Sequence, residues 1–189
     1  TVTKDECNRP QTTLADLQKL PPVFKGGQKV AEGKYITAGN ASQFSDGGAA
    51  LVLMEAKEAE KRGLKPLGAF RGFAVHGCEP DEMGIGPVFA IPRLLKRHGL
   101  KVDDIDLWEL NEAFAAQSLA VLKGLGMADN FDNKVNVNGG AIALGHPLGC
   151  SGARITGTLL NVLEQRDATL GLATMCIGLG QGISTVIER

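Results

Sequence analysis

The sequence predicts an α/β fold, and three observations support that prediction. Apolar strand-like segments alternate with amphipathic helical segments along residues 65–189. Strands that alternate with helices need crossover connections, which produce a mostly parallel sheet with helices on both faces. The 189 residues are 43% hydrophobic and 22% charged, which is typical of an ordinary globular protein.

Residues 1–64 are expected to be the end of a preceding, similar domain. Residues 1–34 are rich in Pro, Lys and polar groups and show only a short helical signal at 14–20. Strands are predicted at 35–39 and 50–54, followed by a helix at 55–62 that ends at Gly63. These elements make no complete unit, so we place a domain boundary between residues 64 and 65.

Residues 65–189 are expected to form the second domain, in the order β-α-β-α-β-α-β-β. Its five strands are predicted at 67–75, 105–110, 135–137, 169–176 and 182–188. Its three helices are predicted at 88–98, 112–123 and 153–165. The last two strands are close in sequence and should pair as an antiparallel hairpin at one end of a five-stranded sheet.

Charge and cysteine usage exclude several classes of protein. A net charge of −1 gives no field that would attract nucleic acid or an anionic membrane. The four cysteines form no CxxC pair and have no histidine at zinc-finger spacing, so neither a disulfide framework nor a metal site is expected. Every apolar run is shorter than a membrane span, and the first residues do not have the pattern of a signal peptide. A cytoplasmic location is therefore expected.

Three short segments carry the residues suited to chemistry. They are residues 111–115 (NEAFA), 138–149 (NGGAIALGHPLG) and 176–182 (CIGLGQG), and each follows a predicted strand. Loops that follow the strands of an open parallel sheet meet at one edge, where such sheets bind ligands. The three segments are therefore expected to converge on one site.

Within these segments three side chains have the required chemistry. His146 lies in a loop of glycines, which suits it to donate to a carbonyl oxygen or to accept a proton from a thiol. Cys176 ends an apolar strand; it is either a buried small hydrophobe or an acid/base beside backbone N–H groups that face an oxyanion. Asn111 most simply caps helix 112–123, although its side chain could also hold a water or a histidine.

In this order the three segments resemble the carboxyl-terminal half of the thiolase family, the acetyl-CoA acetyltransferases and 3-ketoacyl-CoA thiolases. The resemblance extends over essentially the whole chain. It includes Arg9-Pro10, Thr37-Ala38-Gly39-Asn40-Ala41-Ser42, Ser45-Asp46-Gly47 and Met83-Gly84-x-Gly86-Pro87. It implies a thiolase-like fold and acyl transfer between coenzyme A thioesters, by thiolysis of 3-ketoacyl-CoA or condensation of acetyl-CoA. No metal and no permanently bound cofactor are implied.

The resemblance also implies a role for each matching residue. His146 would activate the nucleophilic thiol and, with a water held by Asn111, form an oxyanion hole. Cys176 would be the acid/base, and the backbone N–H of Gly178 would contribute to a second oxyanion hole. Six residues would line the channel for coenzyme A and its pantetheine arm: Arg9, Ala38, Ser42, Met83, Ala113 and Phe114.

The sequence departs from the family in one essential respect. The cysteine that thiolases acylate lies in the first half of their chain, and none of Cys7, Cys78 or Cys150 has a comparable setting. We therefore expect this chain to be one piece of a thiolase, joined by an N-terminal thiolase portion or chain in a dimer or tetramer. The alternative is a non-catalytic fragment that binds acyl-CoA or a partner. A papain-like hydrolase would not explain the order Asn-His-Cys or the hairpin after Cys176.

Overall fold

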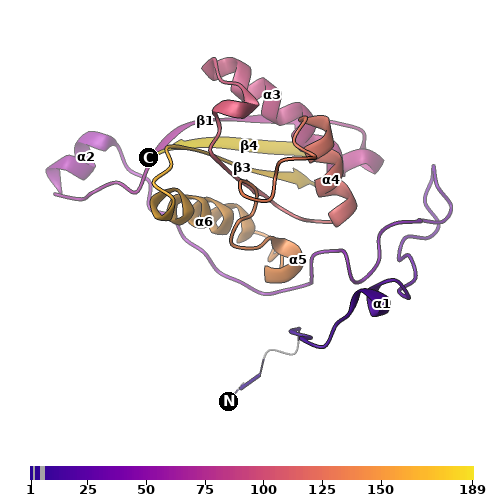
Figure 1. Cartoon of the computed structure of the whole chain (residues 1–189). Helices are drawn as coiled ribbons and strands as arrows, with labels where there is room; N and C mark the ends of the chain where they lie inside the picture. The colour runs from indigo at the N-terminus through magenta and orange to yellow at the C-terminus, as the bar shows by residue number, and fades with distance from the viewer. Residues whose placement is uncertain (2, 5–6) are drawn as a thin grey trace. The chain divides into compact units, whose positions relative to one another are not determined.

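The computed structural model describes residues 1, 3–4 and 7–189, and it is an α/β protein, as the sequence predicts (Figure 1). It divides into two compact units, Thr1–Ala41 and Ser42–Arg189, which are described separately. These two units do not test the predicted domain boundary between residues 64 and 65, which stays a prediction.

The unit Thr1–Ala41 contains little regular structure. Helix α1 (Leu14–Leu17) begins at a capping box in which the Thr13 hydroxyl accepts from the Asp16 backbone N–H. The strand predicted at 35–39 is not formed. Instead the Asn40 side chain accepts from the Thr37 N–H and donates to the Tyr35 carbonyl, each at 2.8 Å, and so it holds a turn there.

The unit Ser42–Arg189 is built on a mixed four-stranded sheet. Its strands are β1 (Ala69–Gly77), β2 (Leu107–Leu110), β3 (Leu170–Ile177) and β4 (Gln181–Glu188), in the order β1-β4-β3-β2. β2 pairs parallel to β3, whereas β4 pairs antiparallel to both β3 and β1. The predicted final hairpin is confirmed. Because β4 lies between β1 and β3, most of the ladders are antiparallel, and the expectation of a mostly parallel sheet is corrected to a mixed one.

The fifth predicted strand, at 135–137, is reduced to a single parallel bridge between Val135 and Trp108. Its backbone leaves the extended conformation at Asn136, where φ is 48°. The Asn136 side chain then continues the pairing. Its Oδ1 accepts from the Leu110 N–H and its Nδ2 donates to the Leu110 carbonyl, both at 2.8 Å.

Helices cover both faces of the sheet (Figure 1). α3 (Gly86–His98) and α4 (Ala115–Gly124) lie on one face, and α6 (Ser151–Gln165) and the short α5 (Ala141–Leu144) lie on the other. Each face has its own apolar core, one centred on Ile91, Leu94 and Val121 and the other on Leu159, Val162 and Leu163. The remaining elements are α2 (Ala56–Lys61) and the 3-10 helices η1 (Pro80–Ile85) and η2 (Val102–Asp104).

Two further predictions differ from the structure, one at the start of α4 and one in the segment 50–54. α4 begins at Ala115 with Phe114 as its N-cap residue, so the prediction that Asn111 caps this helix is wrong. Asn111 lies too far upstream, because residues 111–114 remain extended or turned before the first helical residue. The strand predicted at 50–54 joins no ladder, and Val52 and Leu53 are exposed.

β1 forms one edge of the sheet, and arginines from α3 reach its outer side. Arg97 Nη1 donates to the Phe73 carbonyl and Arg93 Nη1 to the Val75 carbonyl, each at 3.3 Å. Phe70 and Phe73 remain exposed on this strand, with ring centroids 6.4 Å apart. None of the helices in the described part of the chain is long and apolar enough to span a lipid bilayer.

Candidate active site

Asn111 and Cys176 lie at the same edge of the sheet, as predicted. Leu110 ends β2 opposite Thr174 of the parallel strand β3. The backbone N–H of Asn111 continues this pairing by donating to the Thr174 carbonyl at 3.0 Å. Cys176 lies two residues further along β3. The carboxyl ends of two adjacent parallel strands therefore supply both residues.

Asn111 is the most unusual polar group at this edge. Its side chain is 1% exposed, and neither Oδ1 nor Nδ2 has a hydrogen-bond partner among the described residues. A buried amide without partners costs about 1–3 kcal/mol for each unsatisfied group. A ligand or substrate that completes the bonding would remove this cost, which makes the amide a candidate functional group.

The loop that carries His146 is tied to the same strand end by Glu112. Its Oε2 accepts from the Ile142 N–H and its Oε1 accepts from Asn136 Nδ2, each at 3.1 Å. Gly140 passes so close that a Cβ atom there would overlap the Glu112 carboxylate. Because Glu112 directly follows Asn111, its carboxylate joins this strand end to the loop that leads to His146.

His146 is half-buried and held from one side. Its Nδ1 lies 2.6 Å from the Ser151 hydroxyl, at the first residue of α6. Burial lowers the pKa of His146 below its usual value of 6.5, and the charge of Arg154 lowers it further. The imidazole is therefore neutral near physiological pH. A neutral imidazole can accept a proton at one nitrogen or donate from it, depending on its tautomer.

Cys176 is buried, with 6% of its surface exposed. Burial raises the pKa of its thiol to about 11, and the neighbouring Cys78 adds to the rise. Cys176 therefore stays protonated near neutral pH, which suits a proton donor rather than a thiolate nucleophile. The burial agrees with a packed small hydrophobe as well, so the acid/base role depends on the surrounding residues.

A buried carboxylate and an arginine also influence the electrostatics around His146. Glu109 of β2 is 2% exposed, and burial raises its pKa to about 7, with Glu112 adding to the rise and Arg154 opposing it. Arg154 Nε and Nη1 are buried and have no hydrogen-bond partner among the described residues. Arg154 thus acts electrostatically on both Glu109 and His146.

Gly178 lies in the hairpin between β3 and β4. Gly178 is exposed, and a Cβ atom there would meet nothing within 4 Å. The following residue, Leu179, has φ of 67° and is 86% exposed. The Leu179 side chain therefore points outward into solvent.

Four of the predicted substrate residues gather near the start of α4. The Ser42 N–H donates to the Ala113 carbonyl at 2.9 Å, and Phe114 is the N-cap residue of α4. Met83 lies in η1, which packs on α4 where Gly84 meets Gln117. The other two, Arg9 and Ala38, are exposed in the unit Thr1–Ala41 and are described only within it.

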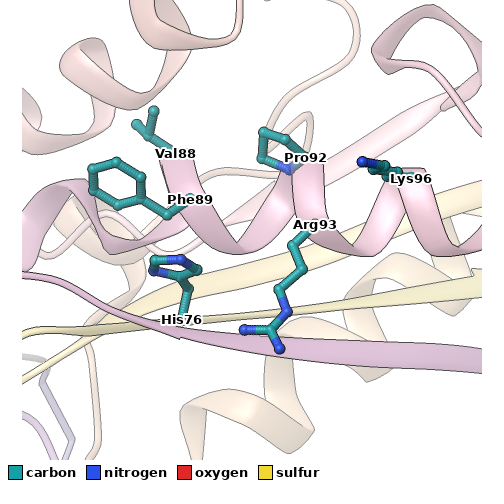
Figure 2. Close-up of a pocket in the computed structure, with 6 residues that line it drawn as sticks. All are labelled: His76, Val88, Phe89, Pro92, Arg93 and Lys96. Atoms are coloured by element: carbon teal, nitrogen blue, oxygen red, sulfur yellow. The ribbon is translucent and has the colours of Figure 1, made fainter.

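A groove of about 470 Å³ lies elsewhere, between α3 and β1 (Figure 2). Figure 2 shows His76 beneath Phe89, whose rings stack with centroids 5.4 Å apart, and Arg93 reaching down to β1. None of the predicted site residues lines this groove. Among the described residues no group of three or more His, Cys, Asp or Glu side chains could hold a metal ion.

The sequence interpretation missed four residues that organise the site, namely Glu109, Asn136, Ser151 and Arg154. A signal existed for Glu109, since a carboxylate inside an apolar strand is rarely buried without a purpose. Asn136 also had one, because Asn tolerates a positive φ and precedes the Gly139-Gly140 turn. Ser151 and Arg154 lie in an ordinary amphipathic helix, where nothing in the local pattern distinguishes them.

Comparison with known proteins identifies the family. The thiolase C-terminal domain matches residues 64–189 and the thiolase N-terminal domain matches residues 1–57. The 3-ketoacyl-CoA thiolase of Idiomarina loihiensis is 60% identical over 188 residues, which are 100% of this chain and 47% of that protein. The 3-ketoacyl-CoA thiolase of Marinomonas sp. is 60% identical over 185 residues, or 98% of this chain and 46% of that one. The chain thus spans about half the length of these curated relatives.

Solved structures agree with the fold. Human mitochondrial 3-ketoacyl-CoA thiolase superposes with a TM-score of 0.83 at 48% identity, over 98% of this chain and 45% of that one. Bacillus anthracis acetyl-CoA acetyltransferase gives 0.87 at 45% identity, again over 98% and 45%. The human enzyme in complex with CoA gives 0.84 at 47% identity, over 100% and 45%. The sequence match and the fold lead to the same conclusion: the chain belongs to the thiolase family.

Proposed function

We propose that this chain is part of a thiolase that transfers acyl groups between coenzyme A thioesters. The observation that carries the proposal is the buried, unpartnered amide of Asn111, at the sheet edge that also presents Cys176 and anchors the His146 loop. The similar proteins from Idiomarina loihiensis and Marinomonas sp. are both named 3-ketoacyl-CoA thiolase, which favours thiolysis of 3-ketoacyl-CoA over condensation.

In this proposal four residues share the acid/base and oxyanion chemistry. His146, neutral near physiological pH, accepts the proton of the nucleophilic thiol. Its imidazole and a water held by Asn111 then stabilise negative charge on the thioester oxygen, where each preorganised donor contributes on the order of 3 kcal/mol. Cys176 donates its proton to the departing group, and the Gly178 N–H serves a second oxyanion.

The nucleophilic cysteine is proposed to come from an N-terminal thiolase portion or chain. The curated relatives are about twice as long as the matched region, so they have room for that portion. We propose that residues 1–64 are the end of that domain and that the assembled protein is a dimer or tetramer in the cytoplasm. The free thiols of Cys78, Cys150 and Cys176 agree with a reducing compartment.

Coenzyme A and acyl-CoA are the proposed small-molecule partners. The human mitochondrial enzyme, solved in complex with CoA, resembles the whole chain. We propose that Ser42, Met83, Ala113 and Phe114, near the start of α4, contact the pantetheine arm, and that Arg9 and Ala38 complete the channel. No permanently bound cofactor and no metal are proposed.

The test begins with native mass spectrometry of the purified chain, alone and after co-expression with an N-terminal thiolase portion. Assembly should be followed by CoA-dependent cleavage of a 3-ketoacyl-CoA, and His146→Ala or Cys176→Ala should reduce turnover by roughly 10²–10⁴-fold. His98→Gln is the matched control, because His98 lies on α3, away from the site residues. Assembly and CoA binding without any turnover would instead support the non-catalytic fragment.

A further inference from the structure

Ser151 connects two groups that compete for one hydroxyl proton. Its Oγ lies 2.6 Å from His146 Nδ1 and 3.1 Å from the Pro147 carbonyl. A hydroxyl has one proton and can accept through its lone pairs. It can therefore donate to Pro147 while it accepts from His146, or donate to His146 itself.

Each arrangement fixes a different tautomer of the imidazole. When Ser151 donates to Pro147, Nδ1 carries the proton and Nε2 presents a lone pair, so His146 is a base. When Ser151 donates to Nδ1, the imidazole proton is on Nε2, so His146 is a hydrogen-bond donor. After protonation at Nε2 the imidazolium again donates from Nδ1 to Ser151, and no heavy atom needs to move.

We propose that Ser151 is a positioning residue. Its hydroxyl accepts from Nδ1–H of His146, so that Nε2 first takes the thiol proton as a base and then, as part of the imidazolium, donates to the oxyanion. This inference rests on the proposed function, because those are the two tasks that the reaction assigns to one imidazole. Ser151 does not touch the reacting atoms in this proposal. It keeps Nε2 directed away from α6 in both the neutral and the protonated imidazole.

The position of Ser151 is suited to this task. It is 2% exposed and begins α6, where its backbone N–H also donates to the Pro147 carbonyl at 3.1 Å. The hydroxyl is thus held by its own helix turn and does not compete with solvent. Among the charged groups on the packed elements, Arg154 of α6 acts on His146, while Glu109 of β2 and Glu112 act on Arg154 or on each other.

The first test observes the imidazole directly, in the full chain and without turnover. Nuclear magnetic resonance of isotope-labelled histidine reports the proton on each ring nitrogen across a pH titration. Ser151→Ala should change both the tautomer balance and the titration of His146, whereas Ser151→Thr, which keeps a hydroxyl, should preserve them. Ser184→Ala is the matched control, because it removes another buried hydroxyl, 2.8 Å from Thr174 Oγ1, on β4.

The second test uses the assembled enzyme. Ser151→Ala should lower kcat by about 10–100-fold, the usual loss when the partner that orients a functional histidine is removed, with KM little changed. The acidic limb of its pH profile should move, and Ser151→Thr should restore both. If the threonine methyl prevents folding, Ser151→Cys takes the place of Ser151→Thr, because cysteine nearly conserves the volume of serine and keeps a weak donor.

The outcomes separate the two proposals. Identical His146 resonances in wild type and Ser151→Ala would overturn the role of Ser151 even if turnover is observed. Absence of turnover in the assembled wild type, with altered resonances in Ser151→Ala, would overturn the proposed function and leave the hydrogen-bond assignment in place.

Discussion

Two asparagines near the end of β2 have opposite environments. Asn136 uses both ends of its amide, pairing with the backbone of Leu110 and the carboxylate of Glu112. Asn111 is more deeply buried, and neither of its amide atoms has a partner among the described residues. The contrast leads to a testable hypothesis: the amide of Asn136 supports the fold, whereas the amide of Asn111 is available to a ligand.

The largest effect should come from Asn111. Asn111→Leu replaces the amide with an apolar group of similar size, so kcat of the assembled enzyme should fall by roughly 10²–10³-fold, the loss expected for one oxyanion donor. Stability should change by less than about 1 kcal/mol or improve, since an unsatisfied buried amide is removed. Steady-state kinetics and urea unfolding check both. A large stability loss with intact kcat would show that Asn111 is structural.

Asn136 should show the opposite pattern. Asn136→Ala removes three side-chain hydrogen bonds and leaves the buried N–H and carbonyl of Leu110 unpaired, which should cost about 3–4 kcal/mol of unfolding free energy. Urea denaturation of the chain measures it. Asn130→Ala is the control, because Asn130 is exposed and should change stability little. A change below about 1 kcal/mol in Asn136→Ala would remove the contrast between the two asparagines.

Glu109 extends the comparison to carboxylates, because Glu112 accepts two N–H bonds while Glu109 is buried and its pKa is lowered only by the charge of Arg154. Burial raises the pKa of Glu109 from 4.5 to about 7. A carboxyl with a higher pKa in the folded state favours folding at low pH. That stability is fully present below about pH 4.5 and is lost as pH rises through about 7.

The difference between these two pKa values corresponds to at most about 3 kcal/mol. Urea midpoints of wild type and Glu109→Gln should therefore diverge with pH. Wild type should lose stability relative to the glutamine variant between about pH 5 and about pH 8. Parallel pH profiles would mean that Glu109 keeps an ordinary pKa.

The smallest effect is expected at the hairpin. Leu179 adopts φ of 67°, a conformation that costs a residue with a Cβ about 1 kcal/mol, whereas the His146 loop uses glycine at its own positive φ positions. Leu179→Gly should raise the unfolding free energy by about 0.5–1 kcal/mol, measured by urea denaturation. A loss of stability would show that the exposed Leu179 side chain makes a favourable contact.

Apart from the strand at 135–137, the strand and helix order of residues 65–189 could be predicted from the sequence, because apolar periodicity and helix-ending glycines are local signals. The place of β4 between β1 and β3 could not, since strand order depends on packing between distant segments. The capping role of Asn111 was wrong for a related reason. The N-cap residue is the one that directly precedes the first helical residue, and here that residue is Phe114. The apolar segment 50–54 has strand composition, but composition alone supplies no neighbouring strand.

The candidate site was predictable only where chemistry and spacing coincide. His146, Cys176 and Asn111 belong to distinctive blocks, so they could be singled out and assigned to one sheet edge. The side chains that orient them could not. Ser151 and Arg154 act through tertiary contacts with the His146 loop, and a helix sequence gives no sign of which polar residue will face a loop five or more positions away.

The arginines on the outer side of β1 have a consequence for how the protein behaves at high concentration. An uncovered sheet edge is a template on which another chain can add a strand and begin fibrous aggregation. Here two of the carbonyls that an incoming strand would need already accept from Arg93 and Arg97. A second molecule would have to displace both cations before it could extend the sheet, so these residues act as a barrier to aggregation beside the exposed Phe70 and Phe73.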